Sequence, residues 1–187
     1  MSTPVRPLRR DAQRNHDLLV QAARDVFADK GLDAPLDEIA RRAGVSAGTL
    51  YHRFSTREAL IEAAMQQHMQ QAIAIAQQAH DNPDPWQGLD FLMRKLIAFQ
   101  AADRGFCETC AERWFASDSP ISQLAKQYDH LAGQVIERAK HAGQLRADFG
   151  VDDLAVVVTG AAYALRTSSA RTTPQRQLDL LQNGIRG

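Results

Sequence analysis

Residues 41–60, RRAGVSAGTLYHRFSTREAL, decide how the N-terminal part of this chain folds. Gly44 stands between two short apolar patterns and can adopt the left-handed backbone conformation that a tight turn needs. After it, Ser46 can cap a new helix, and Leu50 and Phe54 follow at helical spacing. The stretch therefore predicts two short helices clamped across a turn, the second of them barely two turns long.

A longer helix is predicted upstream. Residues 15–30 carry apolar side chains at three- and four-residue spacing, and Gly31 follows as a helix-ending glycine would. A short helix over 36–43 is then entered through Pro35. Together with the helix after Gly44, these elements predict a three-helix N-terminal unit.

The remaining chain is also helical in pattern. Either Ser55 with Glu58 as a capping box, or Thr56 as a simple cap, starts a fourth helix that runs to about residue 78. The boundary between two domains is expected inside this helix. No alternating strand pattern of useful length occurs, so we expect an all-α fold with about nine helices. Further helical patterns begin near residues 84, 119, 151 and 173.

Composition excludes several classes of protein. The 187 residues are 44% hydrophobic with zero formal net charge. No run approaches the ~20 apolar residues of a membrane span, and the first ten residues lack the apolar stretch of a secretory signal. Two cysteines are too few for a disulfide framework. We therefore expect a cytoplasmic protein with no membrane partner.

The helix after Gly44 presents small and polar side chains outward once Val45, Leu50 and Phe54 are buried. A major groove about 12 Å wide admits such a helix, and small residues at its start allow close approach to DNA. Two alternatives stay open: a tyrosine here can pack on the protein surface, and a histidine can simply be solvated. The outward residues are Ser46, Ala47, Gly48, Thr49, Tyr51 and His52.

At this point the sequence resembles a known family. Residues 36–63, LDEIARRAGVSAGTLYHRFSTREALIEA, look like the DNA-binding domain of TetR-type transcriptional regulators, and the likeness covers about residues 18–64. The resemblance implies that Tyr51 lies on the helix that reads the major groove, and that Arg57 grips the phosphate backbone. Pro35 departs from the pattern, because many members carry a threonine there whose hydroxyl contacts phosphate.

The resemblance also implies a domain plan and a function. We expect a basic flexible arm over 1–14, a helix-turn-helix domain over 15–62, and a ligand-binding and dimerisation domain over 63–187. The chain would be a ligand-responsive regulator, a repressor, that binds a palindromic double-stranded operator as a homodimer, without a cofactor or metal. An interaction module without DNA binding is the alternative. Predicted DNA-binding residues are Arg10, Arg14, Arg42, Ser46, Ala47, Gly48, Thr49, Tyr51, His52 and Arg57.

Residues 151–165 form the most apolar predicted helix. It is apolar nearly all round, so it must be covered on more than one side, and its small residues suit close packing against a second chain. Burial of both faces within one chain is the alternative. The predicted dimer interface is Leu154, Val158, Ala161, Leu165, Leu178 and Leu181.

A small-molecule pocket is expected among the C-terminal helices. Aromatic and sulfur-containing side chains on the apolar stripes are the candidates, although each also fits plain core packing. Few charges lie on these stripes, so a hydrophobic or aromatic effector is expected. The candidates are Met65, Met69, Phe91, Phe99, Cys107, Trp114, Phe115, Tyr128 and Tyr163.

The motif CETC, with Cys107 and Cys110, suggests one further hypothesis. Two thiols three residues apart on a helix can share a face, which would suit a thiol-dependent redox sensor or enzyme. A zinc site would need further ligands that no second CxxC or paired histidine supplies. Two half-buried structural cysteines are the simpler interpretation.

Overall fold

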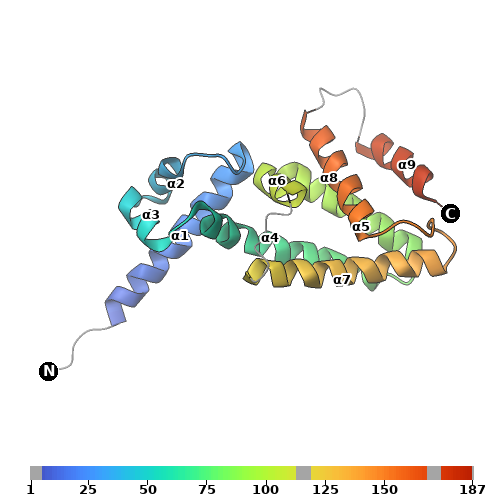
Figure 1. The fold of residues 1–187 in the computed structure, drawn as a ribbon, viewed down its shortest axis with the longest axis horizontal. Helices are drawn as coiled ribbons and strands as arrows, with labels where there is room; N and C mark the ends of the chain where they lie inside the picture. Colours follow the sequence, from blue (N-terminus) through green and yellow to red (C-terminus); the bar gives the residue numbers. More distant parts are fainter. Residues whose placement is uncertain (1–5, 113–118, 168–173, 187) are drawn as a thin grey trace.

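The computed structural model describes residues 6–112, 119–167 and 174–186, and every structural statement below concerns these residues. They form nine helices and no strand, which confirms the predicted all-α fold. In Figure 1 the first three helices gather at one end of an elongated molecule. The helices are α1 (Arg6–Lys30), α2 (Leu36–Ala43), α3 (Ala47–Arg53), α4 (Arg57–His80), α5 (Pro85–Ala102), α6 (Arg104–Glu112), α7 (Pro120–His141), α8 (Val151–Thr167) and α9 (Pro174–Ile185).

The first helix is longer than predicted. It begins at Arg6, so the described part of the expected flexible arm continues the helix instead. Its sequence explains why, because no glycine interrupts it and Pro7 lies in the first turn, where proline is tolerated. The basic residues near the N-terminus are therefore carried on a helix.

A small core holds the three N-terminal helices together. Phe27 of α1, Ile39 of α2 and Leu50 of α3 are all almost fully buried. Burying a large apolar side chain contributes about 1.5–3 kcal/mol, so a few such residues are enough to fix three short helices. The predicted three-helix unit is present in the structure.

Helix α4 connects this unit to the C-terminal helices. Thr56, not Ser55, caps it, and the Thr56 hydroxyl accepts a hydrogen bond from the Ala59 N–H at 3.1 Å. The helix then lies along α7, while α5 packs against α8 (Figure 1). At its far end, Arg138 of α7 donates to the carbonyls of His80 and Asn82, where a cation is favoured by the helix dipole.

Helix α6 touches the N-terminal unit directly. A Cβ added at Gly105 would lie 2.8 Å from Phe27 Cβ and 3.0 Å from the Phe27 carbonyl oxygen. Only a glycine permits this approach, so α6 rests on the C-terminal end of α1 through backbone rather than through a long side chain. No described helix has the length and apolar character to cross a membrane.

Replacing Gly105 by alanine should therefore strain the contact between α6 and α1. We expect Gly105→Ala to lower the free energy of unfolding by about 1–3 kcal/mol, measured by urea unfolding, because the added methyl overpacks the site. Gly133→Ala is the matched control: its Cβ would meet Val151 Cγ2 at an ordinary 3.7 Å. That control should gain about 0.5–1 kcal/mol, as alanine does over glycine within a helix. Equal effects of both changes would contradict the close contact at Gly105.

Candidate nucleic-acid interface and internal cavity

The turn between α2 and α3 depends on Gly44. Its φ is 70°, in the left-handed region, and its N–H bonds back to the last turn of α2. A Cβ here would meet nothing within 4 Å, so backbone conformation, not crowding, favours glycine. Val45 N–H also returns to the Ala40 carbonyl at 3.0 Å. These bonds fix the direction in which α3 leaves the turn.

One face of α3 is anchored and the other is free. Leu50 and Phe54 are only 1% and 5% exposed. Ser46 caps the helix by accepting from the Thr49 N–H at 3.1 Å, and the two hydroxyl groups lie 2.9 Å apart. Because the cap and the buried face both fix α3, its outer face is presented in one orientation.

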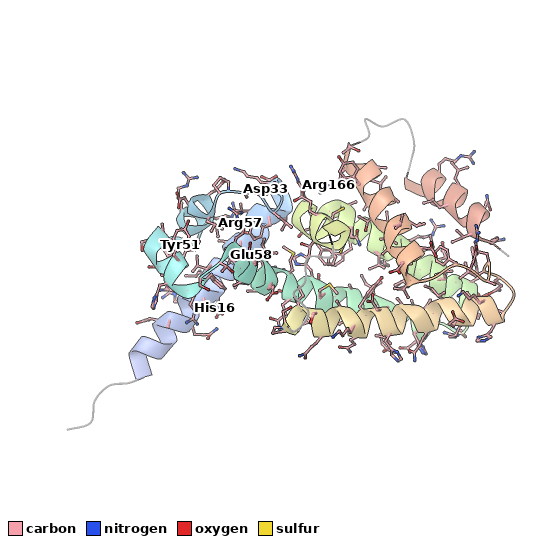
Figure 2. The ribbon with its side chains drawn as sticks, viewed as in Figure 1. His16, Asp33, Tyr51, Arg57, Glu58 and Arg166 are labelled. Carbon is pink, nitrogen blue, oxygen red and sulfur yellow. The ribbon has the colours of Figure 1, made fainter. Side chains whose placement is uncertain are left out.

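The outer face of α3 carries the predicted groove-contacting side chains. Ser46, Ala47, Gly48 and His52 are exposed and Thr49 is half-buried. Tyr51 is 55% exposed and lies at the outer edge of α3 (Figure 2). The structure thus brings the predicted α3 residues together on one surface.

Two predicted phosphate-contacting arginines have intramolecular partners. Arg42 binds the Asp25 carboxylate at 3.0 Å. Arg57 Nη1 donates to the carbonyls of Leu32 and Ala34, at 2.7 and 2.8 Å. The Arg57 guanidinium therefore braces the α1–α2 loop, whose carbonyls need donors, and the predicted phosphate contact would use its remaining N–H groups.

The other basic residues of the N-terminal unit differ in their exposure and contacts. Arg14 is exposed on α1, and the Arg10 side chain lies outside the described part. Arg53, which the sequence analysis did not include, is exposed at the end of α3 and donates to His16 Nδ1 at 3.4 Å. Arg53 lies four residues after Thr49 on the same helix, so helical spacing could have identified it from the sequence.

A cavity of about 340 Å³ lies among α4, α5, α6, α7 and α8. Its wall is mainly apolar, as the sequence predicted, and Met69 and Tyr128 line it. Gln100 and Thr159 are among the polar wall residues that the sequence did not predict. Each lies four residues after another wall residue, Leu96 and Ala155, so helical spacing could have indicated them.

Five other predicted pocket residues do not line this cavity. Met65 and Cys107 are buried about one helical turn before the wall residues Met69 and Cys110, and Tyr163 is 64% exposed on the outside of α8. Apolar or aromatic character alone does not determine whether a side chain reaches the cavity, because this also depends on its position along the helix. The residues corrected are Met65, Phe91, Phe99, Cys107 and Tyr163, while Trp114 and Phe115 lie outside the described residues.

The predicted dimer face of α8 also needs correction. Leu154, Val158 and Ala161 are 0%, 1% and 8% exposed within the single chain, because this side of α8 packs against α5 and the cavity. Leu165 and Leu181 are half-buried, and the Leu178 side chain lies outside the described part. Within the described parts of α8 and α9, the exposed large apolar residues are Val156, Tyr163 and Leu180.

Contacts of α6 join the cavity to the N-terminal unit. Phe106 lines the cavity, and its N–H donates to Asp103 Oδ1 at 2.8 Å at the start of α6. Asp103 Oδ2 lies 2.8 Å from His68 Nε2 of α4. Further along α6, Glu108 accepts a hydrogen bond from the Leu32 N–H at 2.8 Å. The α1–α2 loop is therefore held from α6 by Glu108 and from α4 by Arg57.

The buried His68–Asp103 pair keeps its carboxylate charged. Burial raises the pKa of Asp103, but the hydrogen bonds from His68 and the Phe106 N–H lower it more, so the pKa lies below its usual value. A lowered folded-state pKa stabilises the fold above the unfolded-state pKa, and this contribution is lost as the pH falls through the folded value. The ring of His68 also stacks on Phe99 and Phe106, with centroids 5.6 and 5.3 Å away.

The environment of the two thiols argues against a redox centre. Burial raises the pKa of Cys107, and burial beside Cys107 raises the pKa of Cys110 to about 12. Reactive cysteines need a lowered pKa, since the thiolate is the nucleophile. No group of three or more potential metal ligands occurs in the part of the chain that the structure describes.

Alkylation by iodoacetamide at pH 7.5 measures the reactivity of the two thiols. Because the thiolate fraction falls about tenfold per unit of raised pKa, we expect Cys110 to react roughly two to three orders of magnitude more slowly in the folded chain than in urea. Mass spectrometry of labelled peptides follows each thiol separately. A folded-state rate above the urea rate would instead support an activated thiol.

Comparison with known proteins places these features in a family. Residues 19–64 match the model for bacterial regulatory proteins of the tetR family, and residues 84–187 match the model for the C-terminal domain of SbtR-like transcriptional regulators. A crystal structure of the TetR transcriptional regulator SCO0520 from Streptomyces coelicolor is 30% identical. It superposes with a TM-score of 0.58, over 91% of this chain and 97% of that one.

Curated relatives are also transcriptional regulators. The regulator UidR of Escherichia coli is 37% identical over 65 residues, which is 34% of this chain and 33% of UidR, so the match spans one third of that relative. The repressor KstR2 of Mycolicibacterium smegmatis is 27% identical over 159 residues, 80% of this chain and 74% of that protein. The C-terminal family model alone covers more than half of the chain, and the chain belongs to the TetR family of transcriptional regulators.

Proposed function

We propose that this regulator is a cytoplasmic repressor that binds a palindromic operator as a homodimer and is released by a small, mainly apolar effector. The observation that carries the proposal is the outer face of α3, where small residues and Tyr51 stand free while Leu50 and Phe54 hold the helix in place. The cavity behind α6 supplies a place for the effector. The name of the relative KstR2, a repressor, supports the sign of regulation.

In this proposal α3 lies in the major groove. Gly48 supports close approach, because a Cβ there would meet only Ser46 Oγ at 3.8 Å, so the fold itself does not demand glycine. Thr49, Tyr51 and His52 would face the bases, while Arg53 and Arg14 would contact phosphates. Half-sites would lie about 34–36 Å apart, or a multiple of this helical repeat, because two-fold symmetry must match the DNA.

The dimer would form through the exposed side of α8 together with α9. Val156 and Tyr163 are 73% and 64% exposed on α8, and Leu180 is 55% exposed on α9. Gly160 has no atom within 4 Å of an added Cβ, so a second helix can approach closely there. An exposed apolar stripe of this kind favours a partner, and a two-fold operator requires a second copy.

Release by the effector would act through α6. Phe106 meets the cavity, Gly105 rests on Phe27, and Glu108 holds the Leu32 N–H. A ligand that moves α6 would therefore shift α1 and the loop before α2. Such a ligand changes DNA affinity only as far as it binds the two states differently.

Fluorescence anisotropy with DNA from upstream of the gene, beside a scrambled duplex, tests the DNA-binding proposal. We expect tighter binding to the upstream duplex and a steep loss of affinity as salt rises. Tyr51→Ala should weaken only specific binding, by about 1–3 kcal/mol, as loss of a base contact does. Arg53→Ala is the comparison variant, and it should weaken both duplexes alike and reduce the salt slope by about one. Equal losses on both duplexes for Tyr51→Ala would remove it from the base-reading residues.

Analytical ultracentrifugation tests the dimer. Tyr163→Glu would bury a charge at the proposed interface and should raise the dimer dissociation constant by at least about 100-fold. Gln78→Glu is the control, since it adds the same charge at an exposed position on α4. A monomeric wild type, or a Tyr163→Glu variant that dimerises as tightly as the control, would contradict this interface.

A further inference from the structure

The cavity wall holds a buried amide with an unused donor group. Gln100 is only 6% exposed, and its side-chain oxygen accepts a hydrogen bond from the Thr159 hydroxyl at 3.1 Å. Its amide nitrogen has no hydrogen-bond partner among the described residues. Gln100 lines the cavity, so a bound molecule that supplies an oxygen acceptor would gain a hydrogen bond from this nitrogen.

The polar groups inside the cavity are uncharged. Burial raises the pKa of Tyr128 and raises that of Cys110 to about 12, so both groups are protonated at neutral pH. The charged residues on the described wall are Lys126 and Asp129, which have opposite signs and are both exposed on α7. Apart from these two exposed residues, the described wall offers no full charge to neutralise a buried carboxylate or ammonium.

The free energy of burying charge decides between ligand classes. An isolated ion in an apolar site is costly, whereas a neutral carbonyl or hydroxyl is tolerated when it is hydrogen-bonded. Most of the remaining wall is apolar, including Leu96, Phe106 and Val158. The cavity volume of about 340 Å³ lies near the lower end of typical ligand sites, which run from about 300 to 1,000 Å³. The wall thus suits one compact molecule with a single polar oxygen.

We propose that the effector is an uncharged, mainly apolar molecule with a carbonyl or hydroxyl oxygen, and that Gln100, held by Thr159, recognises this oxygen. The inference rests on the proposed function, because it takes this cavity as the effector site. It excludes free carboxylic acids, amines and large anionic conjugates as effectors.

Isothermal titration calorimetry of the full chain without DNA tests the head group. Two matched probe sets keep the head group separate from ligand shape: 2-acetylnaphthalene, 2-naphthoate and 2-naphthylmethylammonium, and nonan-2-one, nonanoate and nonylammonium. We expect at least one ketone to bind, and to bind about tenfold or more tightly than the carboxylate and ammonium of its set. A charged probe that binds as tightly as its ketone, or no binding by either ketone, would overturn the proposal.

Substitution of Gln100 tests the recognising residue. Gln100→Leu should weaken ketone binding about 3- to 10-fold, which is the loss expected for one hydrogen bond. It should also reduce the ratio of ketone affinity to carboxylate affinity. Gln71→Leu makes the same change at an exposed position on α4 and should leave binding unchanged. Thr159→Val, which releases the Gln100 amide, is the second variant if Gln100→Leu does not fold. Unchanged ketone affinity in a folded variant would overturn the role of Gln100.

Failure of this inference is distinguishable from failure of the proposed function. Ketone binding with the expected ranking, but without release of the operator, would contradict the effector role of the site and leave its chemistry intact. Operator binding with a charged probe preferred would support the regulator and refute the neutral effector.

Discussion

The contact of α6 with the end of α1 is the constraint on which the arrangement of the two units depends. Gly105 brings the α6 backbone onto Phe27, and a side chain at this position would collide with it. The next residue, Phe106, faces the cavity. Two neighbouring residues on one short helix therefore touch the N-terminal unit and the cavity. Because close-packed surfaces shift between discrete arrangements, the proposed effector would move the N-terminal unit by a small change at the cavity.

Charged side chains near this junction hold the fold together. Arg57 and Glu108 bind the same loop, one through its carbonyls and the other through the Leu32 N–H. His68 and Asp103 fix the start of α6 to α4 from inside. As a result, several ionisable groups near the junction have partners within the chain. The exposed residues of α3 are mostly small and uncharged, with exposed arginines at its edges.

The neutral interior of the cavity and the salt-dependent DNA face would respond to different properties of their partners. In the proposed function, DNA binding by exposed arginines would depend on counterion release, while the cavity would select by apolar contact and one or two hydrogen bonds. A neutral effector would leave the charge of the protein unchanged. It would act on DNA affinity through the position of α6, which Gly105 and Glu108 transmit to α1 and its loop.

The sequence by itself determined the all-α fold, the turn at Gly44 and the α3 surface with Tyr51. These are local properties, set by helical periodicity, caps and the conformation of glycine over a few residues. Only the tertiary structure decided the partners of Arg57, the inward direction of Leu154 and Val158, and the presence of Gln100 in the cavity wall. Each of these depends on which distant helix packs against a given face. Periodicity identifies an apolar face but does not show which helix packs against it.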